Sequence, residues 1–434
     1  MRNPALNDAE FLDLSDIAEL RCKRWSEQAG YLAATSGFYD GHFGGQRLEG
    51  ALEELADLPF TDKEMLRRDQ AERPPFGSYL ASVPEKVMRL HRTSGTTGAA
   101  MNLALSAQDA LMTEHVGARA QRAAGLGPGH RVVHCLNYQL WMGGYTDHAT
   151  LELTGATVIP FGVGNSGKLV QTILELGITA ISCTPSYPAV LEQVMREGFP
   201  ELKPSDLGLE LGLFGGEAGL DDPAFRARLE NTWGFAARNA NYGVSDVLCN
   251  FAAQTEECPD LHFVALDVLY PELIDPSSEK LLPWREGESG ELVLTHLAKE
   301  CQPLVRFKTG DIVTLTGLGK ASCGRTAPRF RVTGRTDDMV TVRGLNVFPA
   351  MISAVVNQFP ALSGEFRIML NAPPPYDYLP VEVELSGDEA EGDLALAVER
   401  QMKADIGVSA QVTVLGAKSL PRTEGKTRRV IRTF

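Results

Sequence analysis

The chain has 434 residues, of which 44% are hydrophobic and 22% charged, and this composition is typical of globular proteins. Because so long a chain exceeds one typical hydrophobic core, we expect about two or three domains. The formal net charge of −15 argues against nucleic acid as a partner, since that ligand requires a basic face.

The N-terminal half of the chain changes pattern once. Residues 8–75 are acidic, look helical and contain one Gly-rich turn. From about residue 85, short apolar runs alternate with amphipathic segments. We expect strands at 130–137, 154–162 and 178–186 and helices at 168–177 and 222–234. Strands that alternate with helices indicate βαβ units and a mostly parallel sheet.

Beyond about residue 260 the helical patterns thin out. Short β-rich runs predict a small barrel or twisted sheet: 290–298, 312–317, 330–335 and 339–344. The last 100 residues predict an α+β module, with helices at 346–359 and 395–407 and strands at 366–371, 379–387 and 410–416. We therefore predict an α/β protein. A large N-terminal domain (1–334) contains mostly parallel sheets and a small β-rich subdomain, and a small mobile α+β C-terminal domain (335–434) follows it.

A hydroxyl- and glycine-rich segment, "RTSGTTGAA" at 92–100, is the first candidate for chemistry. Glycines let backbone amides approach oxygen atoms closely, and hydroxyls add donors that suit phosphate. The segment lacks the lysine of a Walker A loop. We expect a strand before it and the helix of residues 106–125 after it. A solvated Ser/Thr/Gly turn is the alternative.

Five further segments occur in a fixed order after this loop: "GLFGGEAGL" (212–220), "NANYGVSD" (239–246), "LVRFKTGDIVTL" (304–315), "GRTDDMVTVRGLNVFP" (334–349) and "PRTEGKTRR" (421–429). Each one is weak alone. Together they resemble the core motifs of adenylate-forming enzymes, and most closely those of the phenylacetate–coenzyme A ligase family. The resemblance extends from about residue 85 to the C-terminus.

The resemblance implies a two-step reaction that uses ATP, Mg²⁺ and coenzyme A. A carboxylate attacks the α-phosphorus of ATP and releases pyrophosphate, and the acyl group then passes to the thiol of coenzyme A. Both steps move negative charge between oxygen atoms, so fixed donors and cations are expected to dominate catalysis. An aromatic or arylacetic acid is the expected substrate.

The resemblance also implies the nucleotide-binding residues. These are Ser94, Gly95, Thr96, Thr97 and Gly98 for the departing phosphates, Gly215, Gly216, Glu217, Asn241, Tyr242 and Gly243 for adenine, Asp311 for the ribose, and Arg335 for the ribose or a phosphate. Of these, Thr96 is also assigned to catalysis, with Lys426 at the reacting carboxylate and α-phosphate. Asp246 is the implied Mg²⁺ ligand. Asp337 is the implied hinge about which the C-terminal domain swings between two poses.

The chain departs from the family pattern at three positions. Ala99 follows the phosphate loop where lysine is usual, which leaves one phosphate charge to Arg92 or Lys168. Asp246 replaces the usual glutamate but remains a hard oxygen donor. Ala218 stands where proline is frequent. A catalytically degenerate nucleotide-binding homologue is therefore one alternative. Another is an adenylating enzyme that delivers its acyl group to a carrier-protein phosphopantetheine or to an amine.

The segment 135–162 is the candidate acyl pocket. Its candidates combine aromatic rings with glycines, which leave a slot for a flat ring, and Phe214 is expected opposite them. The pocket candidates are Tyr138, Trp141, Gly143, Gly144, His148 and Phe214. A core position for Trp141 is the alternative.

Seven cysteines, an odd number in a long chain, are typical of the reducing cytosol. No apolar run reaches 18 residues, so we expect a cytoplasmic protein without a signal peptide or membrane span. Three thiolates and one imidazole can form a closed structural Zn²⁺ site, and the candidates are Cys249, Cys258, His262 and Cys323. Buried free cysteines and a core histidine are the alternative. The resemblance finally implies a homodimer.

Overall fold

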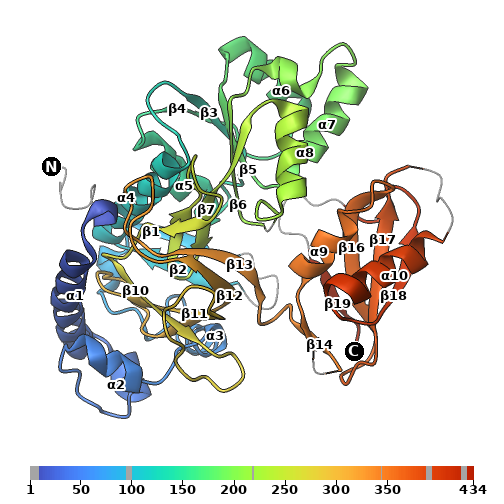
Figure 1. Ribbon diagram of the computed structural model, residues 1–434. Coiled ribbons are helices and arrows are strands. Elements are labelled where there is room, and N and C mark those ends of the chain that lie inside the picture. The colour runs from blue at the N-terminus through green and yellow to red at the C-terminus, as the bar shows by residue number, and fades with distance from the viewer. Residues whose placement is uncertain (1–8, 94–99, 218, 344, 388–392, 422–427) are drawn as a thin grey trace.

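A computed structural model describes residues 9–93, 100–217, 219–343, 345–387, 393–421 and 428–434 (Figure 1). The N-terminal region is helical, as predicted. Its elements are α1 (Leu14–Thr35), α2 (Gly37–His42) and α3 (Lys63–Glu72), with the 3₁₀ turns η2 (Ala9–Phe11), η3 (Leu52–Asp57) and η4 (Pro84–Lys86). Trp25, Leu32 and Tyr39 bury their apolar surface against Leu297 and Val305. This contact attaches the helices to the central sheet.

One sheet of 11 strands runs through the large body of the protein. Its spatial order is β10 (Leu269–Ile274), β11 (Ser289–His296), β12 (Phe307–Gly317), β13 (Arg329–Arg335), β9 (Leu261–Phe263), β8 (Leu248–Ala253), β7 (Ala236–Val244), β6 (Leu211–Gly215), β5 (Ala180–Cys183), β3 (Arg131–His134) and β4 (Thr157–Pro160). Strands β3 to β7 pair in parallel, and β7 pairs with β8 antiparallel. The predicted α/β class is confirmed. The β-rich segment continues the same sheet as its antiparallel half.

Helices cover both faces of the parallel half of this sheet. They are α4 (Ala107–Ala123), α5 (Met142–Glu152), α6 (Ser166–Leu176), α7 (Tyr187–Gly198) and α8 (Pro223–Trp233), with the turn η5 (Pro204–Leu207). Successive strand residues face opposite sides, so Phe214 packs with α6, α7 and α8, whereas Leu213 packs with Leu151 of α5. Figure 1 shows α6, α7 and α8 beside the parallel strands. These covered faces explain the continuous apolar runs in the sequence.

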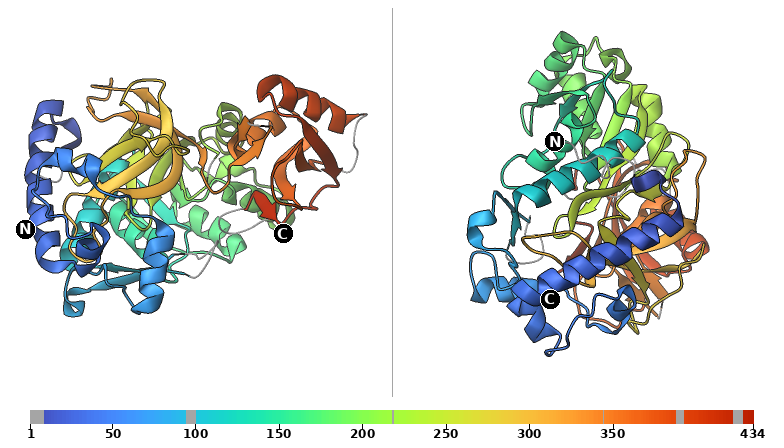
Figure 2. Two further views of the ribbon diagram at one scale, coloured as in Figure 1. Left: turned by 90° about the horizontal axis from the view of Figure 1, so that it is seen from below. Right: turned by 90° about the vertical axis from the view of Figure 1, so that its left-hand side faces the viewer.

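The C-terminal residues form a separate sheet with its own hydrophobic core. Its order is β18 (Ala410–Leu415), β17 (Leu379–Leu385), β16 (Leu362–Leu370) and β19 (Val430–Arg432), covered by α9 (Pro349–Val356) and α10 (Leu394–Asp405). The hairpin of β14 (Val340–Val342) and β15 (Leu345–Val347) precedes it. Two views show this unit projecting from the body (Figures 1 and 2). The amide of Asn357 donates to Asp222 at the start of α8, at 2.6 Å.

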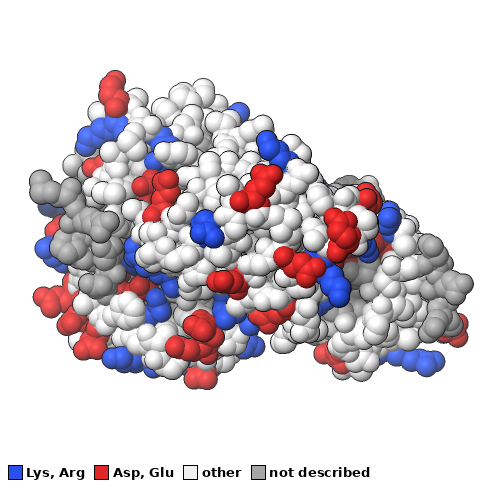
Figure 3. Space-filling model, turned by 90° about the horizontal axis from the view of Figure 1, so that it is seen from above, with Lys and Arg blue, Asp and Glu red and all other residues white. Residues whose placement is uncertain are grey.

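Acidic and basic side chains are interspersed on the face drawn in Figure 3. None of the helices in the described part of the chain combines the length and the apolar composition needed to cross a membrane.

A fully buried ion pair connects three distant segments. Arg119 of α4 donates to both carboxylate oxygens of Asp267, at 2.7 and 3.1 Å, and to the carbonyl oxygen of Val264. Arg24 of α1 approaches the same carboxylate at 3.3 Å, but it is partly exposed. Two cations therefore compensate one carboxylate that is shielded from water.

We predict that Arg119→Met destabilises the protein more than Arg24→Met does. Removing the buried cation leaves Asp267 undercompensated, and breaking a buried pair costs about 3–5 kcal/mol. Removing Arg24 is expected to cost less, because its guanidinium is partly solvated and Arg119 keeps both carboxylate oxygens bonded. The measurement is the thermal unfolding midpoint of the two variants and the wild-type protein. Equal shifts for both variants would contradict this account.

Candidate active site

The predicted phosphate loop connects two antiparallel strands, β1 (Arg89–Arg92) and β2 (Asn102–Leu105). The Thr93 amide donates to the carbonyl oxygen of Met101 at 2.9 Å, and the Met101 amide donates to the Thr93 hydroxyl at 3.0 Å. The expected strand before the loop is β1 and the expected helix after it is α4, and the structure adds the unpredicted strand β2 between the loop and α4. The candidates Ser94, Gly95, Thr96, Thr97 and Gly98 lie outside the described residues, as does Lys426.

The glycines at the end of β6 permit a close approach of two strands. Gly215 pairs with Asn241 of β7, and a Cβ atom on Gly215 would lie 2.6 Å from the Asn241 Cβ. Gly216 follows with a φ of +81°, a conformation that side chains disfavour. Glu217 follows Gly216, and its carboxylate accepts a hydrogen bond from the backbone amide of Ser186 at 3.3 Å. The candidate adenine segments thus lie side by side, as the parallel pairing requires.

A buried carboxylate brings three of the predicted motifs together. The Tyr242 hydroxyl donates to Asp311 Oδ2 at 2.7 Å, and Arg335 forms an ion pair with Asp311 Oδ1. Arg335 also donates from Nε to Asp337 Oδ1 at 2.8 Å. These contacts join β7, β12 and the end of β13. The side chains of the predicted adenine, ribose and hinge motifs therefore form one connected network.

The pKa values of Tyr242 and Arg335 are shifted in this network. Burial raises the pKa of Tyr242 well above its ordinary value, and the charge of Asp311 adds to the effect. Burial alone would lower the pKa of Arg335, but Asp311 and Asp337 raise it above its ordinary value. The Tyr242 ring packs edge-on against Phe251 and Phe330, with centroids 5.2 and 5.4 Å away. The phenol and the guanidinium therefore keep their protons, and the ring is held in place.

Asp246 lies in the turn between β7 and β8 and is 5% exposed. Its Oδ2 accepts from Lys63 of α3 at 2.8 Å, and its Oδ1 is buried without a partner among the described residues. The buried Lys299 donates to the backbone carbonyl oxygens of Asp246 and Val247, at 3.4 and 3.2 Å, and fixes the turn. A hard oxygen atom with an unused lone pair suits Mg²⁺, so the residue fits the predicted ligand role.

Sequence reasoning missed Lys63. It is 183 residues away from Asp246 in the chain, and "TDKEM" is an ordinary helix start. The helix α3 begins at this lysine, and Asp62 caps it by accepting from the Met65 amide. Only the packing of α3 against the sheet places its ammonium group beside Asp246.

The predicted acyl-pocket residues cluster around α5. A Cβ atom on Gly143 would lie 2.9 Å from the Trp141 ring, and one on Gly216 would lie 3.8 Å from it. A Cβ atom on Gly144 would lie 2.3 Å from the Asn137 carbonyl oxygen. The Trp141 ring therefore occupies the slot that Gly143 leaves, at the end of β6.

His148 links two further side chains of this cluster. Its Nδ1 lies 2.9 Å from the Tyr138 hydroxyl, and its Nε2 lies 3.2 Å from the Glu152 carboxylate. Burial raises the pKa of Tyr138 above its usual range, so the hydroxyl remains protonated and can donate to the imidazole.

Phe214 does not face this cluster, and its prediction is corrected. The side chain is fully buried and packs against Phe235, with ring centroids 5.8 Å apart, in the core beneath α6, α7 and α8. The alternation of side chains along β6 turns Phe214 to the opposite face from Leu213.

A further buried carboxylate, Asp147 of α5, was missed by sequence reasoning, as Lys63 was. It is 1% exposed, accepts from the amide Nδ2 of Asn241, and accepts from the Cys249 thiol at 2.5 Å. Burial raises the pKa of Asp147 to about 7, although both hydrogen bonds oppose the shift. A single Asp in a helical segment is usually a solvated residue, so the sequence carried no signal of this role.

The four predicted zinc ligands do not come together in the described structure. Cys249 donates to Asp147 and belongs to that network. Cys323 Sγ lies 3.6 Å from His262 Nε2, and Cys258 is partly buried. Within the described residues no three His, Cys, Asp or Glu side chains form a metal-binding group. Gly243 of β7 lies against Cys249 of β8. A Cβ atom on Gly243 would lie 1.8 Å from the Cys249 carbonyl oxygen.

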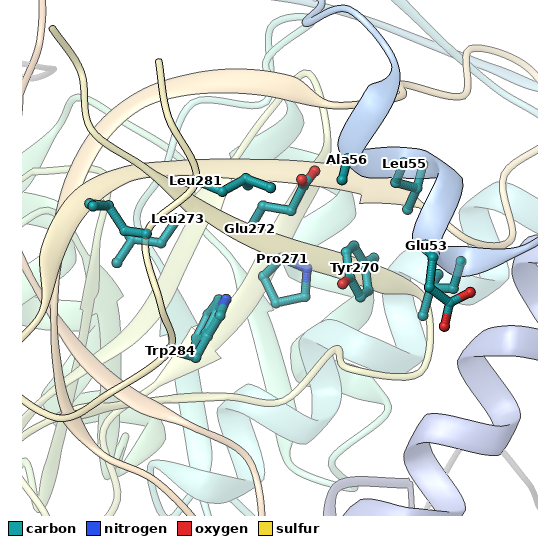
Figure 4. Close-up of a pocket in the computed structure, with 11 residues that line it drawn as sticks. Glu53, Leu55, Ala56, Tyr270, Pro271, Glu272, Leu273, Leu281 and Trp284 are labelled. Carbon is teal, nitrogen blue, oxygen red and sulfur yellow. The ribbon is translucent and has the colours of Figure 1, made fainter. Parts of the chain in front are cut away.

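A separate pocket lies between η3 and β10 (Figure 4). Tyr270, Pro271 and Trp284 line it, together with Glu272, whose carboxylate pairs with Arg306 at 3.0 Å. None of the predicted site residues is among its lining residues. The pocket therefore does not belong to the candidate active site.

Comparisons with known proteins agree with the motifs. A family model described as the AMP-binding enzyme C-terminal domain matches residues 344–433. The phenylacetate-coenzyme A ligase of Pseudomonas putida is 37% identical over 86% of this chain and 84% of its own length. That of Escherichia coli (strain K12) is 33% identical over 87% and 85%.

Solved structures agree as well. A 2-hydroxyisobutyryl-CoA ligase in the postadenylation state, in complex with 2-HIB-AMP, superimposes with a TM-score of 0.89 at 29% identity, covering 98% of this chain and 91% of that one. The fold and the motifs thus define an adenylate-forming ligase, and the predicted enzyme class is confirmed. The chain belongs to the phenylacetate–coenzyme A ligase family.

We predict that Asp147→Asn removes a pH-dependent contribution to stability. The raised pKa means that the folded protein favours neutral Asp147, so this contribution is present at low pH and is lost as pH rises through about 7. Relative to the Asn variant, wild-type stability is expected to fall between about pH 4 and 7, by on the order of 1 kcal/mol per pH unit, and to level off above pH 7. The measurement is the difference in unfolding midpoint across this range. The exposed Glu175→Gln is the control, and a pH-independent difference for Asp147→Asn would refute the assignment.

Proposed function

We propose that the protein activates a carboxylic acid with ATP and transfers the acyl group to coenzyme A. A carboxylate oxygen attacks the α-phosphorus of ATP, and the bond to the pyrophosphate oxygen breaks. The thiolate of coenzyme A then attacks the acyl carbon, and the bond to the AMP phosphate oxygen breaks. The main support is the contact of Tyr242 and Arg335 with Asp311, which unites three nucleotide motifs beside the aromatic cluster of α5.

The nucleotide site is proposed at the carboxyl ends of β6 and β7. Ligands of open α/β sheets bind at such strand ends. Gly215, Gly216 and Glu217 border the adenine with the Asn241 backbone, and Tyr242 packs beside the base. Asp311 accepts from the ribose hydroxyls, and Arg335 stabilises negative charge next to them. The hydroxyls of Ser94, Thr96 and Thr97 and the neighbouring backbone amides of that loop hold the departing phosphates.

Asp246 is the proposed Mg²⁺ ligand, and its buried Oδ1 supports this role. Bound Mg²⁺ would neutralise phosphate charge during the transfer. Lys63 supplies a cation at the same carboxylate. Because Ala99 replaces the usual loop lysine, we propose that Lys63 takes over part of that charge.

The C-terminal unit is proposed to act as a lid, with residues 1–334 as the adenylating domain and 335–434 as the lid domain. Against one 2-hydroxyisobutyryl-CoA ligase, the TM-score is 0.89 in the postadenylation state and 0.70 in the thioesterification state, each over 98% of this chain. The whole-chain arrangement thus matches the first state better. Asp337, bound to Arg335 at the end of β13, is the proposed hinge.

The acid is proposed to be aromatic, because Trp141, Tyr138 and His148 gather beside glycines at the end of β6. Free coenzyme A is the proposed acceptor rather than a carrier protein. The homodimer remains a prediction that sedimentation equilibrium checks.

The test of the function is pyrophosphate release with ATP, Mg²⁺ and a panel of aromatic and aliphatic acids. We expect release that depends on one class of acid, and acyl-coenzyme A formation when free coenzyme A is added. Turnover with a carrier protein but not with free coenzyme A would show that the carrier protein is the acceptor. The absence of pyrophosphate with every acid would overturn the proposal.

We predict that Lys426→Ala strongly lowers adenylation but spares thioester formation from a supplied acyl-adenylate. The ammonium group offsets charge that develops only during the first step, and loss of one such contact costs about 10²–10³-fold in rate. Single-turnover rates of both half-reactions provide the measurement. The exposed Lys418→Ala serves as the matched control. Equal losses in both half-reactions would contradict the role of Lys426.

A further inference from the structure

Asp147, Asn241 and Cys249 form a polar cluster behind the aromatic residues of α5. Asp147 lies one helical turn after Gly143, and both of its oxygens accept hydrogen bonds, one from the Asn241 amide and one from the Cys249 thiol. The carboxyl group is buried from water. An apolar aryl pocket requires no such cluster, because an unpaired polar group in its wall would cost free energy.

The cluster determines which way the Asn241 amide faces. The side-chain nitrogen of Asn241 is the only donor of its amide group, and it donates to Oδ2 of Asp147. Its carbonyl oxygen, Oδ1, then faces away from Asp147 and accepts no hydrogen bond from the described residues. Asn241 itself is partly exposed. The structure thus contains an oriented and unused acceptor.

This acceptor lies where the acyl group is expected. Asn241 borders Gly215, and the Trp141 ring borders Gly216, so both side chains flank the glycine pair that ends β6. The alternation along β7 turns Asn241 towards α5, whereas Tyr242 turns towards Asp311. Asn241 therefore faces the aromatic cluster rather than the proposed ribose contacts.

The charges nearby restrict the ligand further. Residues 137–152 contain no Lys or Arg, and Asp147 carries negative charge when ionised. A second carboxylate on the substrate would find no cation in this segment and would be repelled by Asp147. A neutral hydroxyl or an amino group would instead satisfy the free oxygen of Asn241.

We propose that Asp147 orients Asn241 as a hydrogen-bond acceptor for the tail of the acid, and that the preferred substrate is an acid whose acyl part bears a hydroxyl or amino donor. This proposal rests on the proposed function and refines its substrate class. Asp147 is a positioning residue, because it acts through Asn241. Cys249 assists it by donating to the other carboxylate oxygen.

The experiment compares acids that differ only in the donor. Phenylacetate and benzoate are each assayed with hydroxy and amino derivatives at every ring position, and with methyl derivatives of matched size. The measured quantity is kcat/KM for acid-dependent pyrophosphate release. For wild-type protein we expect at least one donor-bearing acid to exceed its methyl counterpart by ~10-fold or more, because a polar site rejects an analogue that leaves its groups unpaired.

Two variants then test the residues. Asn241→Leu and Asp147→Ala are each expected to lower the ratio of kcat/KM between that donor-bearing acid and its methyl analogue to about one. The exposed Asn371→Leu is the control, which is expected to keep the wild-type ratio. The ratio is insensitive to a general loss of active protein, and the wild-type comparison stands even if a variant does not fold.

Three outcomes would overturn the proposal. The first is a wild-type preference for methyl or unsubstituted acids, and the second is a donor preference that both variants retain. In either case the protein still adenylates acids, so the proposed function stands. The third is the absence of pyrophosphate with every acid, which would overturn the proposed function and this inference together.

Discussion

The carboxylate of Asp311 is the contact on which the arrangement of the active site depends. Its two oxygens bind the Tyr242 hydroxyl and the Arg335 guanidinium, so one buried group joins a strand of the parallel half of the sheet to two strands of the antiparallel half. Burying this charge is tolerable only because both oxygens have partners. The same contacts lie next to Asp337, where the chain leaves the body for the C-terminal unit.

Two other buried carboxylates lie next to β7, one in the turn that follows it and one bonded to Asn241, and they differ in how their charge is compensated. Asp246 has one oxygen on Lys63 and one without a partner among the described residues, so it fits a cation. Asp147 has only neutral donors, and burial raises its pKa to about 7. Asp311, Asp246 and Asp147 thus have three different electrostatic environments, because the groups that contact their carboxylates differ.

The continuous sheet explains how these groups come to lie together. Strand β7 pairs in parallel with β6 and antiparallel with β8, so it belongs to both halves. Its alternating side chains serve two sites: Asn241 contacts α5, and Tyr242 contacts Asp311. A change at this strand would therefore affect the proposed acyl pocket and the proposed nucleotide site together.

The sequence by itself determined the α/β class and the motifs that resemble nucleotide-binding segments, because both depend on residues that are close together in the chain. Apolar runs reveal buried strands, and short segments around Tyr242, Asp311 and Arg335 keep their residue types next to one another. Their convergence followed from the family resemblance, and the Asp311 contacts agree with it. The α+β pattern of the last 100 residues also agrees with the separate C-terminal sheet, although β19 was not expected.

Only the tertiary structure decided the contacts between segments without a local pattern. Lys63 reaches Asp246 across 183 residues, and Asp147 meets Asn241 across 94. Such pairs depend on how helices pack on the sheet, which periodicity does not specify. The same packing places the Phe214 side chain in the core, and it places the Cys249 thiol in a hydrogen bond with Asp147. Side-chain direction on a strand and helix placement above it are properties of the folded sheet, and no single segment contains them.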